Sequence, residues 1–357
     1  MRESINAILK NLNRFLASAR GGNSVRIEVE RFDAMTAFLG ETVERIVLHN
    51  AKGVSVELMT YGALMLAINV PDKNGVVENV LLSYEHLEDY VSNPMYMGAT
   101  IGPNAGRLAG GKLQIRDEVY SLEINEGISN LHGGRKGFHT KIWTMMGEQV
   151  GTDRCSVTLG LEHEHLEDGF PGNIAVKAVF TLYDDGKLTL LYSAISDRAC
   201  HLNMANHNYF NLSGNEKTEI SEHLLMLRSK GFYEVDTHNL PIFDLVSQEC
   251  SEFDFSQQSS LMKALHGDRG GIDHPFVLEH DRLSDAPQVV YEDPISGRRL
   301  EVTTDQPCAV IYTNNIGYKH HMGICFEMQQ VPNKVNLLEG GEPYINETTY
   351  RFSVVSS

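Results

Sequence analysis

Cysteine is scarce in this chain, and its distribution excludes two kinds of small protein. Five cysteines are spread over 357 residues, and no two of them form a Cys-x-x-Cys motif. An odd number of widely separated cysteines is neither a disulfide framework nor the ligand pattern of a small zinc module. The pattern is typical of reduced thiols inside a protein core, and we therefore expect the protein to be cytoplasmic.

Long hydrophobic runs and an excess of basic charge are also missing. Nowhere do the roughly 18 consecutive apolar residues of a membrane-spanning helix occur. Lys and Arg number 30 against 47 Asp and Glu, which gives a formal net charge of −17. Because nucleic acids and anionic membrane surfaces are bound by clusters of Lys and Arg, we expect neither as a partner. A neutral small molecule is compatible with this charge.

Three widespread catalytic motifs are absent as well. The sequence contains no Gly-x-Ser-x-Gly, no Gly-x-Gly-x-x-Gly and no His-Glu-x-x-His, which excludes serine hydrolases, dinucleotide enzymes and zinc proteases of those types. Residues 106–112 superficially match a phosphate-binding loop, but Leu113 follows where a hydroxyl would bind magnesium. His163 and His165 lack the spacing of a helical zinc site. We therefore expect no metal and no cofactor.

What the chain does contain is a succession of short strands. Apolar residues alternate from Val54 to Leu58, and again from Ile174 to Leu182, before a turn at Asp185-Gly186. Two alternating segments around Asp-Gly predict a β-hairpin. Helical patterns are short, as in residues 257–265. Many strands with few helices predict an all-β fold, a large antiparallel sandwich or barrel with a few short helices.

The first residues of the chain have a different pattern. Residues 1 to about 24 carry apolar side chains at helical spacing, interrupted by Lys10 and Arg14, which argues against a secretory signal. We therefore divide the chain into an N-terminal extension, residues 1–40, helical or disordered and of no assigned function, and a single β-sandwich domain, residues 41–357.

One segment near the C-terminus places a carboxylate among apolar neighbours. Ile324 and Phe326 alternate with Cys325 and Glu327, the pattern of a strand with one buried face. Burial disfavours the charged form of a carboxylate and raises its pKa, which makes Glu327 a candidate general base. The alternative is a structural carboxylate paired with an arginine.

Four other polar residues are open to both a structural and a functional interpretation. Arg107, in a glycine-rich turn, could reach a pocket or form a surface ion pair. His132 lies next to two glycines that would let a ligand approach closely. His207, in a polar and aromatic segment, titrates near neutrality and could donate or accept a proton. Asp273, in a tight turn, could cap its own backbone or accept hydroxyl hydrogen bonds.

Together these segments resemble the galactose mutarotase (aldose 1-epimerase) family. The resemblance runs from about residue 43 to 353 and rests on the order of its motifs: Tyr61-Gly62-Ala63, Gly98-Ala99-Thr100-Ile101-Gly102, Asn130-Leu131-His132-Gly133-Gly134, Asp168-Gly169-Phe170-Pro171-Gly172-Asn173, Asn206-His207, Asp273-His274, Gln306-Pro307 and Cys325-Phe326-Glu327. Each motif is weak by itself, whereas the ordered set is specific.

The resemblance implies a β-sandwich isomerase that interconverts the α and β anomers of free aldohexoses such as glucose and galactose, without a cofactor. It implies that Glu327 is the general base and His207 the general acid. It also implies that the sugar hydroxyls and ring oxygen are held by Arg107, His132, Asp273 and Gln306. Pro103 stands where many members have Arg, and Gly106 where many have Asn, which leaves the preferred sugar open.

Several alternatives remain at this point. A glycosidase would use Asp273 and Glu327 as its two carboxylates, and a sugar-binding module would lack turnover. An epimerase on the same fold could act on a disaccharide such as maltose, or on a sugar phosphate, for which Arg135 and Lys136 are available. The sequence is compatible with a monomer and with a homodimer.

Overall fold

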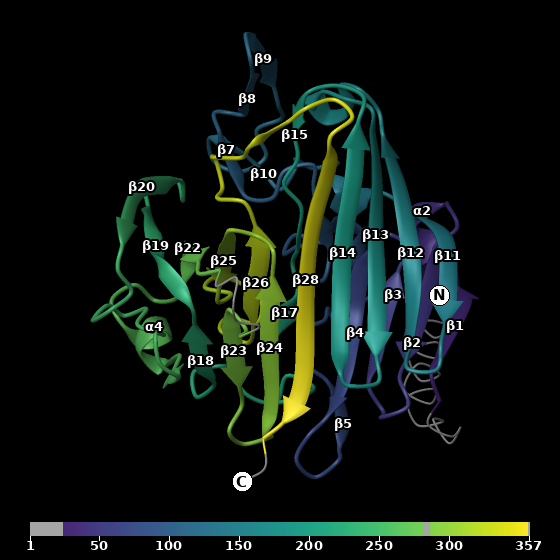
Figure 1. The fold of residues 1–357 in the computed structure, drawn as a ribbon, viewed down its shortest axis with the longest axis vertical. Coiled ribbons are helices and arrows are strands. Elements are labelled where there is room, and N and C mark those ends of the chain that lie inside the picture. Colours follow the sequence, from purple (N-terminus) through teal and green to yellow (C-terminus); the bar gives the residue numbers. More distant parts are fainter. Residues whose placement is uncertain (1–23, 281–285, 356–357) are drawn as a thin grey trace.

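Antiparallel strands account for most of the fold. The computed structural model describes residues 24–280 and 286–355. In this part of the chain the strands form sheets of five, nine and six strands and four sheets of two strands. Figure 1 shows the long strands of the nine-stranded sheet in front of the five-stranded sheet, so that two layers face each other. The predicted all-β class and the large antiparallel sandwich are confirmed.

The five-stranded sheet follows the chain order β1-β2-β3-β4-β5. Its strands are β1 (Arg26–Arg31), β2 (Glu44–His49), β3 (Ser55–Met59), β4 (Leu64–Pro71) and β5 (Val77–Asn79), and α2 (Asp33–Leu39) connects β1 to β2. β1 pairs with β2 along its whole length. The sheet therefore begins inside the segment that we assigned to an extension ending at residue 40.

The missed strand has a physical signal in the sequence. Val25, Ile27 and Val29 alternate with charged residues, and Val25 and Ile27 pack against the main core. Residues 26–39 accordingly belong to the sandwich and are neither an extension nor a continuation of the predicted N-terminal helix. The pattern that predicted that helix lies in residues 1–23, outside the described residues.

The nine-stranded sheet has the order β11-β12-β13-β14-β28-β24-β23-β18-β21. Its strands are β11 (Thr144–Val150), β12 (Arg154–His163), β13 (Ile174–Tyr183), β14 (Lys187–Ser196), β18 (Leu224–Leu227), β21 (Ser259–Ser260), β23 (Val289–Glu292), β24 (Arg298–Thr304) and β28 (Pro343–Val354). β13 and β14 pair on both sides of the Asp185-Gly186 turn, which confirms the predicted hairpin. The C-terminal strand β28 lies between β14 and β24 and joins the two halves of the sheet.

The six-stranded sheet, of order β17-β26-β25-β22-β19-β20, contains the strand of Glu327. Its strands are β17 (Tyr209–Phe210), β19 (Ser229–Val235), β20 (Pro241–Val246), β22 (Asp273–Leu278), β25 (Cys308–Tyr312) and β26 (Ile324–Gln329). All residues of β26 are buried, whereas the alternation predicted one buried face. The second face is covered because loops from elsewhere in the chain enclose it.

Four two-stranded sheets pair segments that lie outside the three large sheets. The pairs are β6 (Thr100–Ile101) with β16 (Ala205–Asn206), β7 (Arg107–Ala109) with β10 (Ser129–Leu131), β8 (Lys112–Ile115) with β9 (Glu118–Ser121), and β15 (Cys200–His201) with β27 (Leu337–Leu338). Short pairings of this kind fix loops to one another by backbone hydrogen bonds, so side chains on them can be placed accurately.

In the described part of the chain, helices are short, as predicted. Besides α2 they are α3 (Asp89–Ser92), α4 (Met262–His266) and the 3-10 turns η1 (Phe138–Thr140) and η2 (Glu167–Gly169). The predicted helix over residues 257–265 is shorter than expected, because its first part forms β21. Within residues 24–280 and 286–355, no helix has the length and apolar character needed to cross a membrane.

The main core lies between the layers. Ile46 and Leu48 of the five-stranded sheet belong to the same buried cluster as Val176 and Phe180 of the nine-stranded sheet. These are the inward positions of an alternating pattern, so the period of two in the sequence specifies which face of each strand is buried. A second buried cluster includes Tyr209 and Cys325 and lies next to the site described below.

Candidate active site

One large cavity contains most of the polar residues singled out in the sequence. Its volume is about 1020 Å³, and it is lined by strands of the six-stranded sheet and by the loops around them. Arg107, His132, His207, Asp273 and Glu327 all line it. The fold therefore brings together five of the six predicted site residues, from segments far apart in the chain.

The floor of the cavity is one face of three neighbouring strands, β22, β25 and β26. Asp273 lies opposite Tyr312 in the register, and Val310 lies opposite Glu327. Residues opposite each other, and residues two apart, point to the same face of a sheet. Asp273, Val310, Tyr312, Glu327 and Gln329 accordingly all line the cavity. The alternation that predicts the strand thus also directs the Glu327 carboxylate into the cavity.

His207 is positioned by the short β6–β16 pairing that immediately precedes it. Its backbone N–H donates to the carbonyl of Ala99 at 3.0 Å, and its carbonyl accepts from the N–H of Gly98 at 3.0 Å. The Asn206 amide donates to the Gly98 carbonyl at 3.2 Å. Three hydrogen bonds therefore hold this backbone in place, and the imidazole projects from a fixed point.

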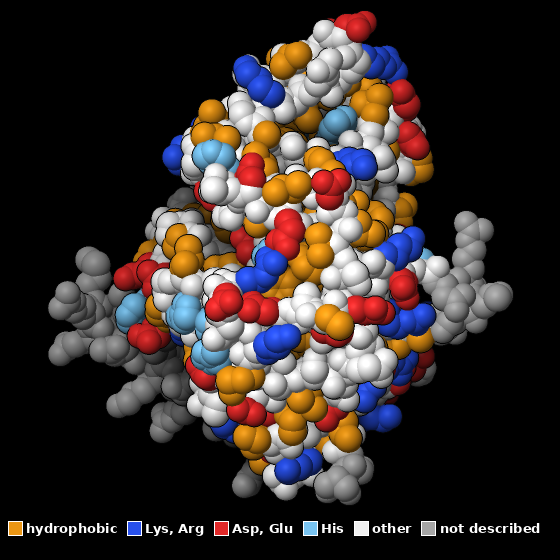
Figure 2. Space-filling view, turned by 90° about the vertical axis from the view of Figure 1, so that its left-hand side faces the viewer, with side chains coloured by type: hydrophobic (Ala, Val, Ile, Leu, Met, Phe, Trp, Pro, Cys, Tyr) orange, Lys and Arg blue, Asp and Glu red, His pale blue; other side chains and the backbone are white. Residues whose placement is uncertain are grey.

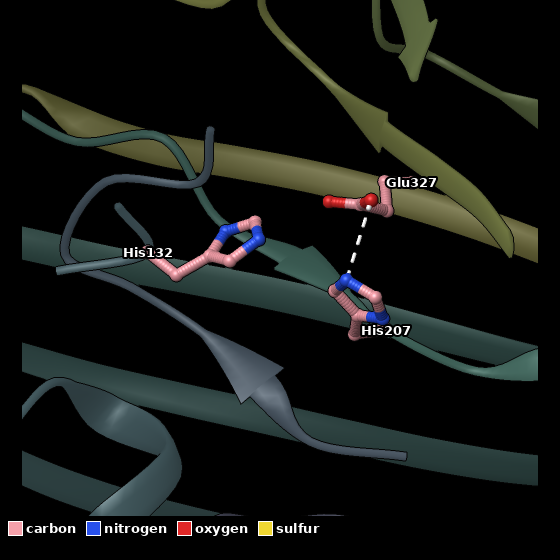
Figure 3. Close-up of side chains that lie close together, drawn as sticks. All are labelled: His132, His207 and Glu327. Carbon is pink, nitrogen blue, oxygen red and sulfur yellow. Dashed lines mark ion pairs between the residues drawn. The ribbon is translucent and has the colours of Figure 1, made fainter. Parts of the chain in front are cut away.

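Glu327 and His207 face each other inside the cavity. Glu327 Oε1 lies 3.5 Å from His207 Nε2, and only 3% and 4% of the two residues is exposed (Figure 3). Burial, helped by the nearby negative charge of Asp273, raises the pKa of Glu327 to about 8. Burial also lowers the pKa of His207 to about 4.

These two shifts determine how many protons the pair holds. Between about pH 4 and about pH 8 the pair in the unliganded cavity carries one proton. When two groups lie this close, the proton belongs to the pair, and a short transfer converts a neutral acid and imidazole into a carboxylate and an imidazolium. The pair thus contains one proton donor and one proton acceptor around neutral pH.

His132 is a hydrogen-bond donor to the cavity. Its Nδ1 accepts the backbone N–H of Gly106 at 3.2 Å. Burial lowers the pKa of His132 well below its usual range, with His207 and Arg107 acting in the same direction, so the ring is neutral. A neutral ring whose Nδ1 accepts a hydrogen bond carries its proton on Nε2.

Tyr96 supports both imidazoles and had no signal in the sequence. Its ring lies edge-on to His132, with centroids 4.7 Å apart, and 5.9 Å from the ring of His207. His132 and His207 are themselves in edge-to-face contact at 5.3 Å. Aromatic contacts of this geometry restrict ring rotation. The two histidines are therefore oriented by packing as well as by hydrogen bonds.

His132, His207 and Glu327 are the candidate metal ligands among the described residues. Ligand atoms of His132, His207 and Glu327 lie within 4.8 Å of one another (Figure 3). A metal needs a free lone pair on each imidazole. His132 offers none, because Nδ1 is occupied by the Gly106 N–H and Nε2 carries the proton. The arrangement suits a ligand rich in hydroxyl groups better than a cation.

Arg107 and Asp273 form the charged wall of the cavity. Arg107 lies on β7, next to Leu131 of β10, and forms two hydrogen bonds of 3.1 Å with Glu126. Its Nη1 is 4.0 Å from Asp273 Oδ2. Burial raises the pKa of Asp273, and Arg107 opposes that shift. Within the described residues the Asp273 carboxylate accepts no hydrogen bond, so it is available to hydroxyl groups.

Gln306 does not lie in this cavity, which corrects the sixth predicted site residue. Its amide donates to Asp305 Oδ1 at 2.7 Å and to the Ile345 carbonyl at 3.4 Å, and it does not line the cavity. The reason is its position before β25 begins at Cys308. Of the residues of β25, Val310 and Tyr312 are the ones that face the cavity.

Gln329 is the glutamine that the cavity does contain. It is fully buried, and its Nε2 lies 3.4 Å from Glu327 Oε2 while its Oε1 accepts from Asn203 at 3.0 Å. The signal that could have identified it is its spacing. A residue two positions after Glu327 on the same strand must share its face.

The two basic residues suggested for a phosphate group lie elsewhere. Arg135 is exposed and paired with Glu123, and neither Arg135 nor Lys136 lines the cavity. Residues 106–112 form β7, a turn at Gly110-Gly111 and the start of β8. The interpretation of these glycines as turns that present Arg107 is therefore confirmed, and no helix follows to make a phosphate loop.

Comparison with known proteins connects this geometry to one family. The family model described as aldose 1-epimerase matches residues 44–351. Galactose mutarotase from Bos taurus is 32% identical over 332 residues, covering 88% of this chain and 95% of that protein. Aldose 1-epimerase from Escherichia coli K12 is 29% identical over 339 residues, with 88% and 96% covered. The crystal structure of galactose 1-epimerase from Lactobacillus acidophilus NCFM has a TM-score of 0.82 at 26% identity, covering 93% of this chain and 100% of that one.

Proposed function

This chain belongs to the aldose 1-epimerase family, and we propose that Glu327 and His207 carry its reaction, the interconversion of the α and β anomers of a free aldohexose. The chain is thus an isomerase, and the family resemblance seen in the sequence is confirmed. The observation that carries the assignment of residues is the buried Glu327–His207 contact of 3.5 Å.

Anomer exchange needs one proton removed and one proton added. A base takes the proton of the anomeric hydroxyl while an acid protonates the ring oxygen, and the C1–O5 bond breaks to give the open-chain aldehyde. Rotation about the C1–C2 bond followed by closure on the other face gives the second anomer, with the two groups exchanging roles. Each proton transfer contributes on the order of 10²–10⁴-fold in rate.

The one-proton state of the pair supplies both groups at once. We assign the base to Glu327 and the acid to His207, with the proton passing between them across their contact when the sugar binds. Hydroxyl hydrogen bonds to the carboxylate favour its ionised form, and so does the nearby Arg107. After one turnover the pair again holds one proton, so no external proton donor is required.

The other cavity residues are suited to holding a neutral sugar. His132 offers an N–H, Arg107 offers guanidinium donors, and Asp273 accepts hydroxyl hydrogen bonds. Arg107 and Arg269 are the cations among the cavity-lining residues of the described chain, and each is bonded to a glutamate. A phosphate group would find no unpaired cation there. Figure 2 shows the face of the molecule that lies on the left in Figure 1, where acidic, basic and hydrophobic side chains are intermixed.

The test is the rate of mutarotation of fresh α-D-glucose and α-D-galactose, followed by polarimetry. We expect Glu327→Gln and His207→Gln to lower kcat by ~10²–10⁴-fold each. Gln306→Ala is the matched control, since the resemblance suggested a role for Gln306 but it lies outside the cavity. Near wild-type rates in either cavity variant would refute the acid–base assignment.

Location and assembly are separate from the chemistry. We propose a cytoplasmic protein, since the five cysteines are free thiols, four of them buried. Monomer and homodimer are both compatible with the proposed reaction, because every proposed site residue comes from one chain. Sedimentation equilibrium of the full chain distinguishes them.

A further inference from the structure

The imidazole of His207 contacts two side chains of one strand. Glu327 Oε1 lies 3.5 Å from Nε2, and Cys325 Sγ lies 3.6 Å from Nδ1, the nitrogen that is turned away from Glu327 (Figure 3). Cys325 and Glu327 are two positions apart on β26, so they share the face of the sheet that forms the cavity floor. Tyr209 of β17 pairs with Cys325, which brings the segment of His207 to this point of the strand. Both ring nitrogens therefore face groups that β26 positions.

The thiol of Cys325 meets His207 as an uncharged group. Cys325 is fully buried, and burial raises the pKa of its thiol well above the usual range, with the charge of Glu327 acting in the same direction. Within residues 24–280 and 286–355, Cys325 is the one side chain at hydrogen-bond distance from Nδ1. Four further titratable side chains surround the ring without bonding to Nδ1: Tyr96, His132, His139 and Tyr209.

The proposed reaction specifies which ring nitrogen must stay free. Proton exchange takes place at Nε2, the nitrogen that faces Glu327. A neutral imidazole carries its single proton on one nitrogen, so His207 can receive a proton at Nε2 only while its own proton is on Nδ1. The other tautomer would direct an N–H at the carboxyl group of Glu327 and block proton transfer within the pair. The tautomer of a histidine is set by the hydrogen bond of its second nitrogen.

We propose that Cys325 is a positioning residue for the reaction: its sulfur accepts the Nδ1–H of His207 and thereby keeps the Nε2 lone pair directed at Glu327. The backbone carbonyl of His207 supports the same tautomer. Burial lowers the pKa of His207, and a hydrogen bond from the ring to this carbonyl, which can only accept, opposes the shift. The inference rests on the proposed function and adds a residue that does not itself line the cavity.

An uncharged acceptor suits this place. A carboxylate beside Nδ1 would stabilise the imidazolium and raise the pKa of His207, whereas a thiol sulfur is a weak, neutral acceptor. His207 is thus oriented while burial keeps its pKa at about 4. A low pKa makes the imidazolium a strong acid, which favours proton transfer to the weakly basic ring oxygen of a sugar.

The first experiment determines the tautomer of His207 in the unliganded protein near neutral pH. Long-range proton–nitrogen NMR spectra of the protein labelled with ¹⁵N-histidine show which ring nitrogens are protonated, and the spectrum of His207→Gln identifies the signals of His207. We expect Nδ1 to carry a proton in wild type and in Cys325→Ser, and the neutral Nε2–H form to appear in Cys325→Ala. A wild-type His207 that is neutral with its proton on Nε2 would overturn the proposal.

The second experiment measures the mutarotation of fresh α-D-galactose by polarimetry. Cys325→Ala should lower kcat about 10-fold, the order expected for one hydrogen bond, with little change in KM because Cys325 does not touch the sugar. Cys325→Ser keeps an acceptor and should recover most of the loss. An unchanged kcat in Cys325→Ala would overturn the proposal, and so would a Cys325→Ser variant as slow as Cys325→Ala. The wild-type spectrum and Cys325→Ser remain as tests should Cys325→Ala fail to fold.

Cys155→Ala is the matched control. Cys155 is also fully buried, and its thiol donates to the His49 carbonyl at 3.5 Å, but it lies on β12 in the main core. We expect its kcat to equal that of wild type, and a fall as large as in Cys325→Ala would overturn the specific role of Cys325. Absence of mutarotation in the wild-type protein would refute the proposed function itself, whereas the tautomer of His207 is measured without turnover.

Discussion

A change of pH should reduce the activity on both sides of a plateau, because the reaction needs the pair Glu327–His207 to hold one proton. Below about pH 4 both groups are protonated, and the pair contains no base. Above about pH 8 both have lost their protons, and the pair contains no acid. Only the interval between these values supplies a donor and an acceptor together.

The size of the effect follows from the two pKa values. We expect kcat/KM to be nearly constant around pH 6 and to fall ~10-fold per pH unit beyond each limit. The limits belong to the free enzyme, since kcat/KM reports the unliganded state. An unperturbed Glu and His would give a much narrower interval, from about pH 4.3 to about pH 6.5. The width of the plateau therefore measures the burial of the pair.

The assay is polarimetry in a constant-ionic-strength buffer series, with the spontaneous rate subtracted at each pH. Asp273→Asn adds a second test, because the negative charge of Asp273 helps to raise the pKa of Glu327. The alkaline limit should move to lower pH in this variant, whatever happens to the rate, while Gln306→Ala should reproduce the wild-type limits. A profile that stays flat from pH 3 to pH 9 would refute the reasoning.

Three further predictions concern the surroundings of the pair. In Glu327→Gln, the free energy of unfolding relative to wild type should increase between about pH 4.5 and about pH 8, by up to ~1.4 kcal/mol per pH unit. The reason is that the wild-type carboxyl ionises over this range in the unfolded chain but stays protonated in the folded protein. Urea midpoints of both proteins at pH 5 and pH 8 test this, and an equal difference at the two pH values would contradict it. Gly106→Ala should destabilise the fold by roughly 1–3 kcal/mol, because Gly106 has a φ of 78° and a Cβ would meet Pro332 at 2.9 Å; unchanged thermal unfolding would disprove the strain. Gln329→Leu removes a hydrogen bond that lowers the pKa of Glu327, so the alkaline limit of activity should move to higher pH; a shift to lower pH would exclude this role.

The fold could be predicted where its signal is local. The hairpin around Asp185-Gly186 and the strand of Glu327 follow from an alternation of period two and from turn chemistry. The same alternation is present in Val25, Ile27 and Val29. Because these residues follow a segment of helical pattern, we assigned them to the N-terminal extension ending at residue 40 and not to a strand. Helix lengths were less accurate, because β21 (Ser259–Ser260) takes up the first part of the segment with the helical pattern and α4 begins only at Met262.

The candidate site could be predicted in composition but not in detail. Arg107, His132, His207, Asp273 and Glu327 do line one cavity. Gln306 was wrong, because its distance from the start of β25 decides where its side chain points, and no sequence pattern specifies that start to one residue. Tyr96 was missed, since an aromatic contact between loops leaves no mark in the order of residues. Gln329 was missed although its position two residues after Glu327 places it on the same face of the strand.

The amino-acid sequence by itself determined the strands, the buried faces, and the residue types available for proton transfer, because hydrophobic periodicity and turn chemistry act over a few neighbouring residues. The tertiary structure decided that Glu327 and His207 lie 3.5 Å apart and that the cavity continues to Tyr318. It also decided that burial raises the pKa of Glu327 to about 8 and lowers that of His207 to about 4. Distances and burial depend on segments far apart in the chain, so they are properties of the packed fold and not of any one segment.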